Sequence, residues 1–357
     1  MQPTRLLLLA DTSAPEALGS KFLRGASAAG LDPAPEAGEL AVAYSSPALA
    51  FSPSMARLRG KVFYRVADRR SWEWWGFQRS LLERIERLRP RLVVVTGILP
   101  LAPSVFTAVH RHGGRIVNYL TDDPWNPIHR RRCFLANLPL YDHIFSTKQA
   151  LRQRLELAGT PSTSWLPFAY DPALHHPPAT AQGTKEGEAC EQVDVAFVGT
   201  GAPERLPWLA ALADLPGLRR RIHGNGWSSL ATPGWERNEA VTGEHYMRAI
   251  AGPKVVLGLL RQANGDLSTD RSYEIGAIGG CGLYQDSSEH RELLGDYPEV
   301  GFFRNPRELR ERVQQVMADP GLQKVLRQRG AEALQRPGHT YADRLRSILE
   351  WAEGPNP

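Results

Sequence analysis

The stretch RSYEIGAIGGCG, residues Arg271–Gly282, combines a carboxylate, a short apolar helix pattern and a run of glycines. Glu274 opens the helix pattern, and the glycines end it before a strand-like apolar pair at Leu283 and Tyr284 and a polar loop at residues 285–288. The free N–H groups and the dipole at a helix N-terminus attract phosphate, and a carboxylate can accept hydrogen bonds from sugar hydroxyls. The stretch therefore predicts a helix that faces a ligand bearing phosphate and sugar.

Strand and helix patterns alternate throughout the rest of the chain. In the first half, we expect strands at residues 5–10, 92–96, 115–120, 143–146 and 165–168, and helices at 15–30, 77–88, 104–112 and 148–158. In the second half, we expect strands at 193–198, 219–223, 254–260 and 300–303, and helices at 204–212, 244–251, 273–279, 306–317, 321–329 and 341–352. This alternation predicts an α/β fold with two doubly wound parallel sheets.

A segment rich in proline, alanine, glycine and glutamate, residues 171–192, has no hydrophobic period and separates the two halves. We expect residues 1–170 and 193–335 to form two Rossmann-like domains that face a cleft, with 171–192 as a linker. Ligands bind beyond the carboxyl ends of the strands in such sheets. In the first half, this rule selects the loops that begin at Asp11, at Thr96 and at residues 121–123.

Composition limits the class of protein. The chain has 357 residues, 42% of them hydrophobic and 23% charged, with a net charge of +5, which is ordinary for a globular protein of two domains. An anionic small ligand or an anionic membrane surface would explain the charge better than nucleic acid, because no nucleic-acid module is recognisable. The three cysteines have no C-x-x-C spacing, so we expect no disulfide framework and no metal site. No apolar run is long enough for a signal peptide or a membrane span, which favours a cytoplasmic protein, with peripheral contact to the inner face of the membrane as an option.

Several short motifs occur in a recognisable order between residues 90 and 350. They are Asp122–Asp123–Pro124, Tyr141–Asp142, Leu166–Pro167–Phe168, Val198–Gly199–Thr200, Arg271–Ser272–Tyr273–Glu274, and His339–Thr340–Tyr341 with Arg344. In these motifs the chain resembles GT-B glycosyltransferases, in particular the group of the spore-maturation protein CgeB. The resemblance implies that the second domain binds a nucleotide-sugar donor, that the first binds the acceptor, that residues 336–357 form a helix that crosses back, and that no metal or other cofactor is essential. Related retaining enzymes carry a carboxylate pair, E-x7-E, whose positions here are Asp266 and Glu274, so the first member is an aspartate.

The candidate donor-binding residues lie in the loops and in the helix of the second half. They are Gly199, Thr200, Gly201, Arg205, Gly224, Asn225, Trp227, Asp266, Arg271, Tyr273 and Glu274. Glu274 is expected to hold hydroxyls of the ribose or of the sugar, although it could instead only complement the helix dipole. Arg271 would neutralise the diphosphate, or would form an ion pair with Glu274 or Asp270. We expect Asp270 to cap the helix of Glu274.

The expected roles of the donor-side loops also have structural alternatives. The glycines at 199 and 201 would let backbone N–H groups approach a phosphate, with Arg205 as the accompanying cation, or would form an ordinary turn. Trp227 would stack on the base, or would be a partly buried side chain in a turn. Asp266 would contact the transferred sugar, or would belong to an Asn-Gly-Asp turn.

In the first domain, the candidate catalytic residues are Asp122, Asp123 and Asp11. Any of them could accept the proton of the acceptor hydroxyl if the enzyme inverts configuration. The alternatives for the first two are a helix N-cap or an Asx turn before Pro124. The cluster of Trp72, Trp74, Trp75 and Phe77 beside Arg69 and Arg70 is either core packing or a surface for the acceptor or for a membrane.

Together these features predict a metal-independent glycosyltransferase of the hexosyltransferase type. It would transfer a sugar from a nucleotide-diphospho-sugar to a hydroxyl of a carbohydrate, glycolipid, protein or small molecule, without a nucleic-acid partner. The alternatives are a nucleotide-sugar epimerase or hydrolase on the same fold, and a catalytically silent binding protein. The sequence leaves the sugar, the base, the acceptor, the stereochemistry and the oligomeric state open.

Overall fold

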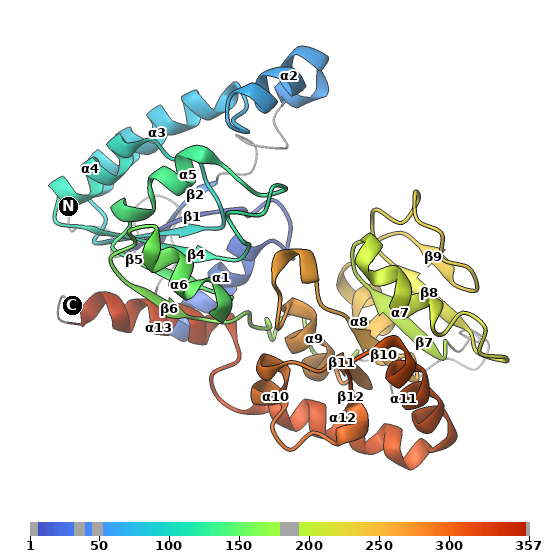
Figure 1. The fold of residues 1–357 in the computed structure, drawn as a ribbon. Coiled ribbons are helices and arrows are strands. Elements are labelled where there is room, and N and C mark those ends of the chain that lie inside the picture. Colours follow the sequence, from blue (N-terminus) through green and yellow to red (C-terminus); the bar gives the residue numbers. More distant parts are fainter. Residues whose placement is uncertain (1–5, 32–39, 45–52, 179–192, 355–357) are drawn as a thin grey trace. The chain divides into compact units, whose positions relative to one another are not determined.

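The computed structural model describes residues 6–31, 40–44, 53–178 and 193–354 (Figure 1). The chain divides into two compact units. Unit 1 contains Met1–Pro167 together with Tyr341–Pro357, and unit 2 contains Phe168–Thr340. None of the helices in the described ranges is both long enough and apolar enough to cross a membrane.

Unit 1 is built on a parallel sheet of six strands in the order β2-β1-β3-β4-β5-β6. The strands are β1 (Leu6–Ala10), β2 (Leu40–Tyr44), β3 (Leu92–Thr96), β4 (Arg115–Leu120), β5 (His143–Ser146) and β6 (Thr163–Trp165). β1 and β3 are buried along their whole length, as their uninterrupted apolar sequences predict for a parallel sheet covered on both faces. The chain order reverses between these two strands, which pair with Leu7 opposite Val93.

Helices surround this sheet, and the last helix of the chain returns to it. The helices of unit 1 are α1 (Leu18–Ala26), α2 (Leu58–Val66), α3 (Glu73–Leu88), α4 (Pro103–Arg111), α5 (Arg132–Ala136), α6 (Arg152–Leu157) and α13 (Tyr341–Glu353), with 3-10 turns at Ser27–Ala29, Pro53–Ala56, Leu138–Leu140 and Gln149–Leu151. α13 packs closely on α1, because a Cβ atom at Gly25 would lie only 2.8 Å from the backbone nitrogen of Ala342. The ring of Phe22 meets that of Tyr341 edge to face at 5.3 Å.

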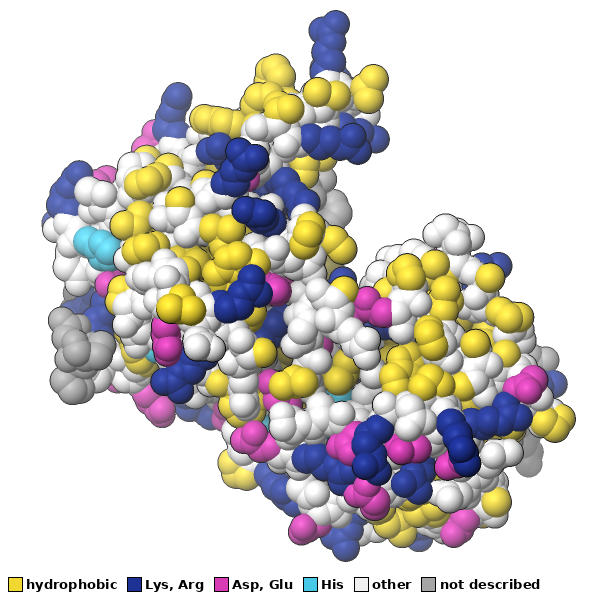
Figure 2. All heavy atoms as spheres, viewed as in Figure 1, with side chains coloured by type: hydrophobic (Ala, Val, Ile, Leu, Met, Phe, Trp, Pro, Cys, Tyr) yellow, Lys and Arg dark blue, Asp and Glu magenta, His cyan; other side chains and the backbone are white. Residues whose placement is uncertain are grey.

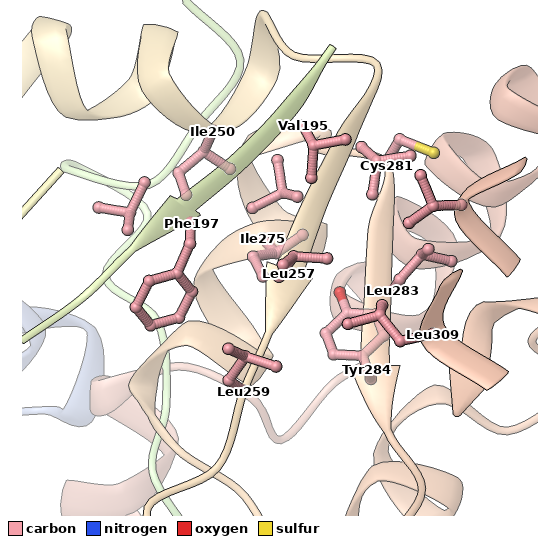
Figure 3. Packing of buried hydrophobic residues seen from close by; sticks show 14 of the residues in the cluster. Val195, Phe197, Ile250, Leu257, Leu259, Ile275, Cys281, Leu283, Tyr284 and Leu309 are labelled. Atoms are coloured by element: carbon pink, nitrogen blue, oxygen red, sulfur yellow. The ribbon is translucent and has the colours of Figure 1, made fainter. Parts of the chain in front are cut away.

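Unit 2 repeats the architecture with a parallel sheet in the order β12-β11-β10-β7-β8-β9. Its strands are β7 (Val195–Val198), β8 (Arg220–His223), β9 (Glu236–Asn238), β10 (Val255–Gly258), β11 (Gly282–Gln285) and β12 (Phe302–Phe303). Its helices are α7 (Leu206–Ala210), α8 (Gly243–Ala251), α9 (Asp270–Ile278), α10 (Ser288–Leu294), α11 (Pro306–Ala318) and α12 (Pro320–Gln335), with 3-10 turns at Pro203–Arg205, Gln262–Asn264 and Glu299–Gly301. Figure 3 shows side chains of β7, β10 and β11 packed together with Ile275 of α9 and Leu309 of α11.

The predicted α/β class and the two parallel sheets are confirmed, but several elements differ from the expectation. The sequence patterns missed β2, β9, α2, α5 and α10, and α10 begins at Ser288, the last residue of the polar loop expected at residues 285–288. The boundary between the domains also differs. Asp171–Pro178, expected in the linker, belongs to unit 2, where the backbone N–H groups of Leu174 and His175 donate to the carbonyl of Asp171. Residues 179–192, the rest of the expected linker, lie outside the described residues.

Candidate functional site

The chain order of the unit 2 sheet reverses between β7 and β10. Loops that leave the carboxyl ends of two such strands diverge to opposite faces, and the crevice between them is where open α/β sheets bind ligands. The loop after β7 carries Arg205, the loop after β10 carries Arg261, and α9 carries Arg271 in its first turn. This end of the sheet therefore brings three guanidinium groups into one electrostatic environment, in which Arg205 senses the charges of both other arginines.

Arg205 is almost fully buried, with 5% of its surface exposed. Its Nη1 donates to the carbonyl of Thr200, and its guanidinium lies 5.0 Å from the centre of the Phe197 ring. Its Nε has no hydrogen-bond partner among the described residues. Burial, and next the charge of Arg261, lower the pKa of Arg205 to about 10. A buried cation with an unsatisfied N–H group is costly, and an anionic ligand would remove that cost.

The helix that carries Glu274 begins one turn earlier than expected. Thr269 is its N-cap, and a capping box joins the Thr269 and Ser272 side chains to each other's backbone N–H groups. The helix therefore starts at Asp270, and Glu274 lies inside it rather than at its N-terminus. The expectations that Glu274 opens the helix and that Asp270 caps it are wrong, because a threonine followed three residues later by a serine satisfies the free N–H groups first.

Glu274 is the centre of a buried hydrogen-bond network. The residue is only 2% exposed. Its carboxylate accepts a hydrogen bond from the Tyr246 hydroxyl at 2.5 Å and forms an ion pair with Arg271. The other carboxylate oxygen lies 3.2 Å from Nε2 of His175. Nδ1 of His175 accepts the backbone N–H of Asp171 at 3.0 Å, so the proton of the neutral ring is on Nε2, where it can be donated to Glu274. No pattern in the sequence indicated this role for His175, because the residue lies in a proline-rich segment without periodicity.

Arg271 connects this network to the end of β7. Its Nε donates to the carbonyl of Val198 at 2.9 Å, and its guanidinium lies 4.7 Å from the centre of the Tyr246 ring. Burial alone would lower the pKa of Arg271, but the interactions with Tyr246 and Glu274 outweigh it, so the group stays charged. Arg271 has 32% of its side chain exposed while Glu274 is enclosed, so the arginine is the member of the pair that a ligand can reach.

The glycines of the two loops mainly bring the loops together. A Cβ atom at Gly201 would lie 2.4 Å from the carbonyl oxygen of Gly226, and one at Gly224 would lie 2.1 Å from that of Gly199. The N–H group of Gly201 donates to Asn225 at 2.7 Å, and that of Gly199 donates to the carbonyl at the end of β8. These two N–H groups therefore serve the contact between the loops, and Asn225 is exposed at the tip.

Three other candidates lie at the same end of the sheet, but they are largely enclosed. Trp227 is 3% exposed and donates its Nε1–H to the carbonyl of Gly199 at 2.8 Å, which favours the buried alternative and leaves no exposed ring face for a base. Asp266 is 7% exposed and accepts Nδ2 of Asn264 at 3.1 Å, as in the turn considered from the sequence. Tyr273 is 3% exposed.

In unit 1, Asp122 and Asp123 follow β4, and Asp11 follows β1 at the point where the sheet order reverses. Asp122 accepts the Thr121 hydroxyl at 3.1 Å and lies 3.5 Å from Nε2 of His129, with 31% of its side chain exposed. Asp123 forms an Asx turn by accepting the N–H of Trp125 at 2.8 Å. Asp11 similarly accepts the N–H two residues later, at 2.9 Å. Of the two residues after β4, Asp122 has the more exposed side chain, at 31% against 18% for Asp123.

The part of the chain that the structure describes holds no group of three or more histidine, cysteine, aspartate or glutamate side chains arranged to bind a metal ion. The cofactor prediction made from the sequence stays a prediction. The cationic side chains described above at this end of the unit 2 sheet are those of Arg205, Arg261 and Arg271.

Comparison with known proteins agrees with this architecture. Residues 205–350 match the family model described as glycosyl transferase-like, and no curated protein matches. The α,α-trehalose 6-phosphate synthase structure from Burkholderia multivorans shares 14% identity and superimposes with a TM-score of 0.62, covering 98% of this chain and 96% of that chain. T4 phage BGT in complex with UDP and Mn²⁺ shares 10% identity with a TM-score of 0.56, covering 98% of this chain and 99% of that chain. A putative UDP-N-acetylglucosamine 2-epimerase from Listeria monocytogenes shares 11% identity with a TM-score of 0.53, covering 100% and 99% of the two chains. These similarities confirm the GT-B fold that the sequence motifs predicted.

Proposed function

We propose that the protein is a glycosyltransferase that takes its sugar from a nucleotide-diphospho-sugar. The observation that carries this proposal is the buried guanidinium of Arg205, whose Nε lacks a partner within the described residues. It lies after β7, where the sheet order reverses and where Arg261 and Arg271 add positive charge. A diphosphate would satisfy all three cations. The match of residues 205–350 to the glycosyl transferase-like model supports the same class of function.

In this proposal, arginine stabilises the diphosphate that leaves as the sugar is transferred. Negative charge grows on the leaving group in the transition state, and fixed cations in a dry site stabilise it more effectively than water does. Arg205 is held by Thr200, so little reorganisation is needed when the ligand binds. Because arginine can supply this stabilisation, the reaction would need no metal ion.

Glu274 would bind a hydroxyl of the ribose or of the sugar. Its carboxylate is already used by Tyr246, His175 and Arg271, so a hydroxyl must share or displace one of these donors. Arg271 is the donor that can leave, because it is the exposed member of the pair. As Arg271 turns towards a phosphate, a hydroxyl would take its place on the carboxylate. Tyr246 and His175 would keep that carboxylate oriented throughout.

On the acceptor side, we propose that Asp122 accepts the proton of the attacking hydroxyl if configuration is inverted. Its side chain is 31% exposed, and Nε2 of His129 lies 3.5 Å from the carboxylate. Asp123 is less suited to this role, because its side chain is engaged in the Asx turn and lies 3.4 Å from Arg154. A hexosyl donor and a carbohydrate, lipid or small-molecule hydroxyl acceptor complete the proposal.

A sugar-nucleotide epimerase is the second candidate, and the similarity to the Listeria epimerase structure favours keeping it. Such an enzyme would bind the same kind of donor but would need no acceptor. Incubating the protein with a nucleotide sugar alone separates the two functions. An epimerase changes the sugar while leaving it on the nucleotide, whereas a transferase gives turnover only when an acceptor is added.

The first experiment measures the affinity for a panel of nucleoside diphosphates by isothermal titration calorimetry. Arg205→Gln removes the buried charge, and Arg307→Gln is the matched control, since that arginine is 89% exposed on α11. Loss of a charge-assisted hydrogen bond costs about 1.5–3 kcal/mol, so the affinity of Arg205→Gln should fall by about 10- to 150-fold. If no nucleoside diphosphate binds, or if both variants bind as the unchanged protein does, the proposed site is wrong.

A further inference from the structure

Helix α2 exposes an apolar stripe that the described residues of unit 1 leave uncovered. Leu58, Val62 and Val66 recur every four residues, so their side chains lie along one face of the helix. They are 78%, 54% and 78% exposed. Figure 2 shows hydrophobic side chains and Lys or Arg side chains together over this helix, at the top of the view. A stripe of this kind on a surface helix marks an interaction site.

Two tryptophans extend the stripe. Of the aromatic cluster noted in the sequence, Trp74 belongs to the core, because it is fully buried and donates its Nε1–H to the carbonyl of Pro100 at 3.0 Å. Trp72 and Trp75 instead are 60% and 45% exposed. Their rings lie 5.0 and 5.5 Å from that of Phe63 on α2, which joins them to the helix. Trp74 therefore fits the core alternative, whereas Trp72 and Trp75 are exposed.

The charge around the stripe is positive. Between residues 53 and 76 the chain has six basic residues and two acidic ones. Both acidic side chains are engaged within the protein: Asp68 accepts the backbone N–H groups of Arg132 and Cys133, and Glu73 accepts the backbone N–H and the hydroxyl of Ser54. The exposed basic residues of α2 and its N-cap are Arg57, Arg59, Lys61 and Arg65. The surface thus pairs exposed aliphatic and tryptophan side chains with cations.

The helix is held in place without using the stripe. The guanidinium of Arg131 donates to the carbonyl of Arg69 and to the hydroxyl of Tyr64, and it lies 5.9 Å from the centre of the Tyr64 ring. At the other end, Gly60 packs so closely on Ser54 that a Cβ atom would lie 1.9 Å from its carbonyl oxygen. The fold therefore fixes α2 through its inner face and leaves its apolar face directed away from unit 1.

We propose that α2, with Trp72 and Trp75, docks unit 1 on an anionic phospholipid bilayer. Aliphatic side chains gain free energy when they enter the boundary between headgroups and acyl chains, tryptophan rings favour the interface, and cations are attracted to anionic headgroups. A nucleic acid would attract the same cations but would gain nothing from Leu58, Val62 and Val66. The residues of this surface belong to unit 1 and those of the proposed donor site to unit 2, so the inference stands or falls independently of the donor-site proposal.

The test is co-sedimentation of the full chain with sucrose-loaded vesicles of phosphatidylglycerol and phosphatidylcholine, compared with vesicles of phosphatidylcholine alone. We expect binding to the anionic vesicles that weakens as salt is added. The triple variant Leu58→Gln, Val62→Gln and Val66→Gln should lose binding. The matched control is Leu157→Gln, because Leu157 is an apolar side chain of unit 1 that is 81% exposed at the end of α6. It should bind as the unchanged protein does.

Two single substitutions of basic residues separate the contribution of charge from that of the apolar stripe. Arg59→Gln and Lys61→Gln should each weaken partition into anionic vesicles by about fivefold, since a cation near such a surface contributes about 1 kcal/mol. Circular dichroism and nucleotide binding should be unchanged in all variants, because every substituted side chain is exposed. Absence of binding to anionic vesicles would overturn the proposal, as would equal binding by the triple variant. Salt-dependent binding of an oligonucleotide that the triple variant retains, with no vesicle binding, would assign the surface to nucleic acid instead.

Discussion

The contact between His175 and Glu274 gives the sharpest test of how the candidate donor site is organised. Both residues are enclosed, with 4% and 2% of their surfaces exposed, and Nε2 of the histidine lies 3.2 Å from the carboxylate. On the other side of the ring, Nδ1 accepts the N–H of Asp171. The imidazole therefore bridges the first residues of unit 2 to the middle of α9, and both of its nitrogens are used.

His175→Ala would remove both contacts. Loss of a hydrogen bond to a buried charged group costs about 1.5–3 kcal/mol, and an unsatisfied buried backbone N–H costs about 1–3 kcal/mol. We expect a total loss of about 3–5 kcal/mol. In a unit of the size of Phe168–Thr340, each kcal/mol shifts the melting temperature by about 2–4 °C, so the unit 2 transition should fall by about 10 °C.

The next residue along the chain provides the control. His176 is exposed, and Nδ1 of its ring lies 3.0 Å from the neighbouring carbonyl oxygen of Pro177. His176→Ala should therefore change the stability by less than about 0.5 kcal/mol. Differential scanning calorimetry measures both variants and can resolve the unit 2 transition. If the two variants melt at the same temperature, the network around Glu274 does not contribute as its geometry requires.

A double-mutant cycle with Glu274→Gln would show whether the contact itself carries the effect. Residues in direct contact show interaction energies of about 0.5–3 kcal/mol, whereas independent residues give additive changes. We expect a coupling at the upper end of that range, because the pair is buried and one partner is charged. Calorimetric titration with a nucleoside diphosphate on His175→Ala adds a functional measurement: affinity should fall more than it does for His176→Ala. Additive stabilities together with unchanged affinity would refute a positioning role for His175.

A close contact between helices and a buried histidine give two further predictions. Gly276→Ala on α9 should lower stability by about 1–3 kcal/mol, because its Cβ would lie 2.7 Å from the carbonyl oxygen of Gly330 on α12. Gly76→Ala on α3, where nothing lies within 4 Å, should raise stability by about 0.5–1 kcal/mol, and urea unfolding of both variants would contradict the packing argument if their changes had the same sign. Burial lowers the pKa of His143 to about 4 from 6.5, so the unfolded chain binds a proton at a higher pH and stability should fall by up to about 3 kcal/mol as pH drops from 6.5 to 4. His143→Gln should flatten this part of the stability profile, and an unchanged slope would mean that another group titrates there.

The sequence correctly predicted the elements that consist mainly of apolar residues and are buried. β3 and β4 are uninterrupted apolar or nearly apolar runs, and their predicted bounds agree with the structure. β9 was missed because it is a three-residue edge strand made of polar residues, Glu236–Asn238. α2 was missed although Leu58, Val62 and Val66 recur at helical spacing, because three basic residues and Gly60 lie among them and weaken the apolar pattern.

Only part of the candidate site could be predicted, because spacing in the sequence shows local patterns and does not show which segments pack together in space. Arg205 and Arg271 could be chosen because they follow strands whose ends meet at one edge of the sheet. Burial of Trp227 and the partnership of His175 with Glu274 depend on which segments pack together, and no spacing in the sequence encodes that. His175 in particular lies in a segment with the composition of a linker, yet its ring is almost fully enclosed.

The loop glycines show why a glycine-rich turn is ambiguous evidence for a phosphate site. Absence of a side chain allows a backbone to approach either a ligand or another backbone, and the sequence is the same in both cases. Here Gly201 and Gly224 face the opposite loop so closely that no Cβ atom would fit. The glycines thus build the rigid end of the sheet, while an unsatisfied N–H group remains on the side chain of Arg205, among the described residues. We therefore base the proposed anion binding on Arg205 and not on the glycines. The glycines allow the two loops to pack together, and Thr200 of the first loop accepts a hydrogen bond from Arg205 at the end of the strands.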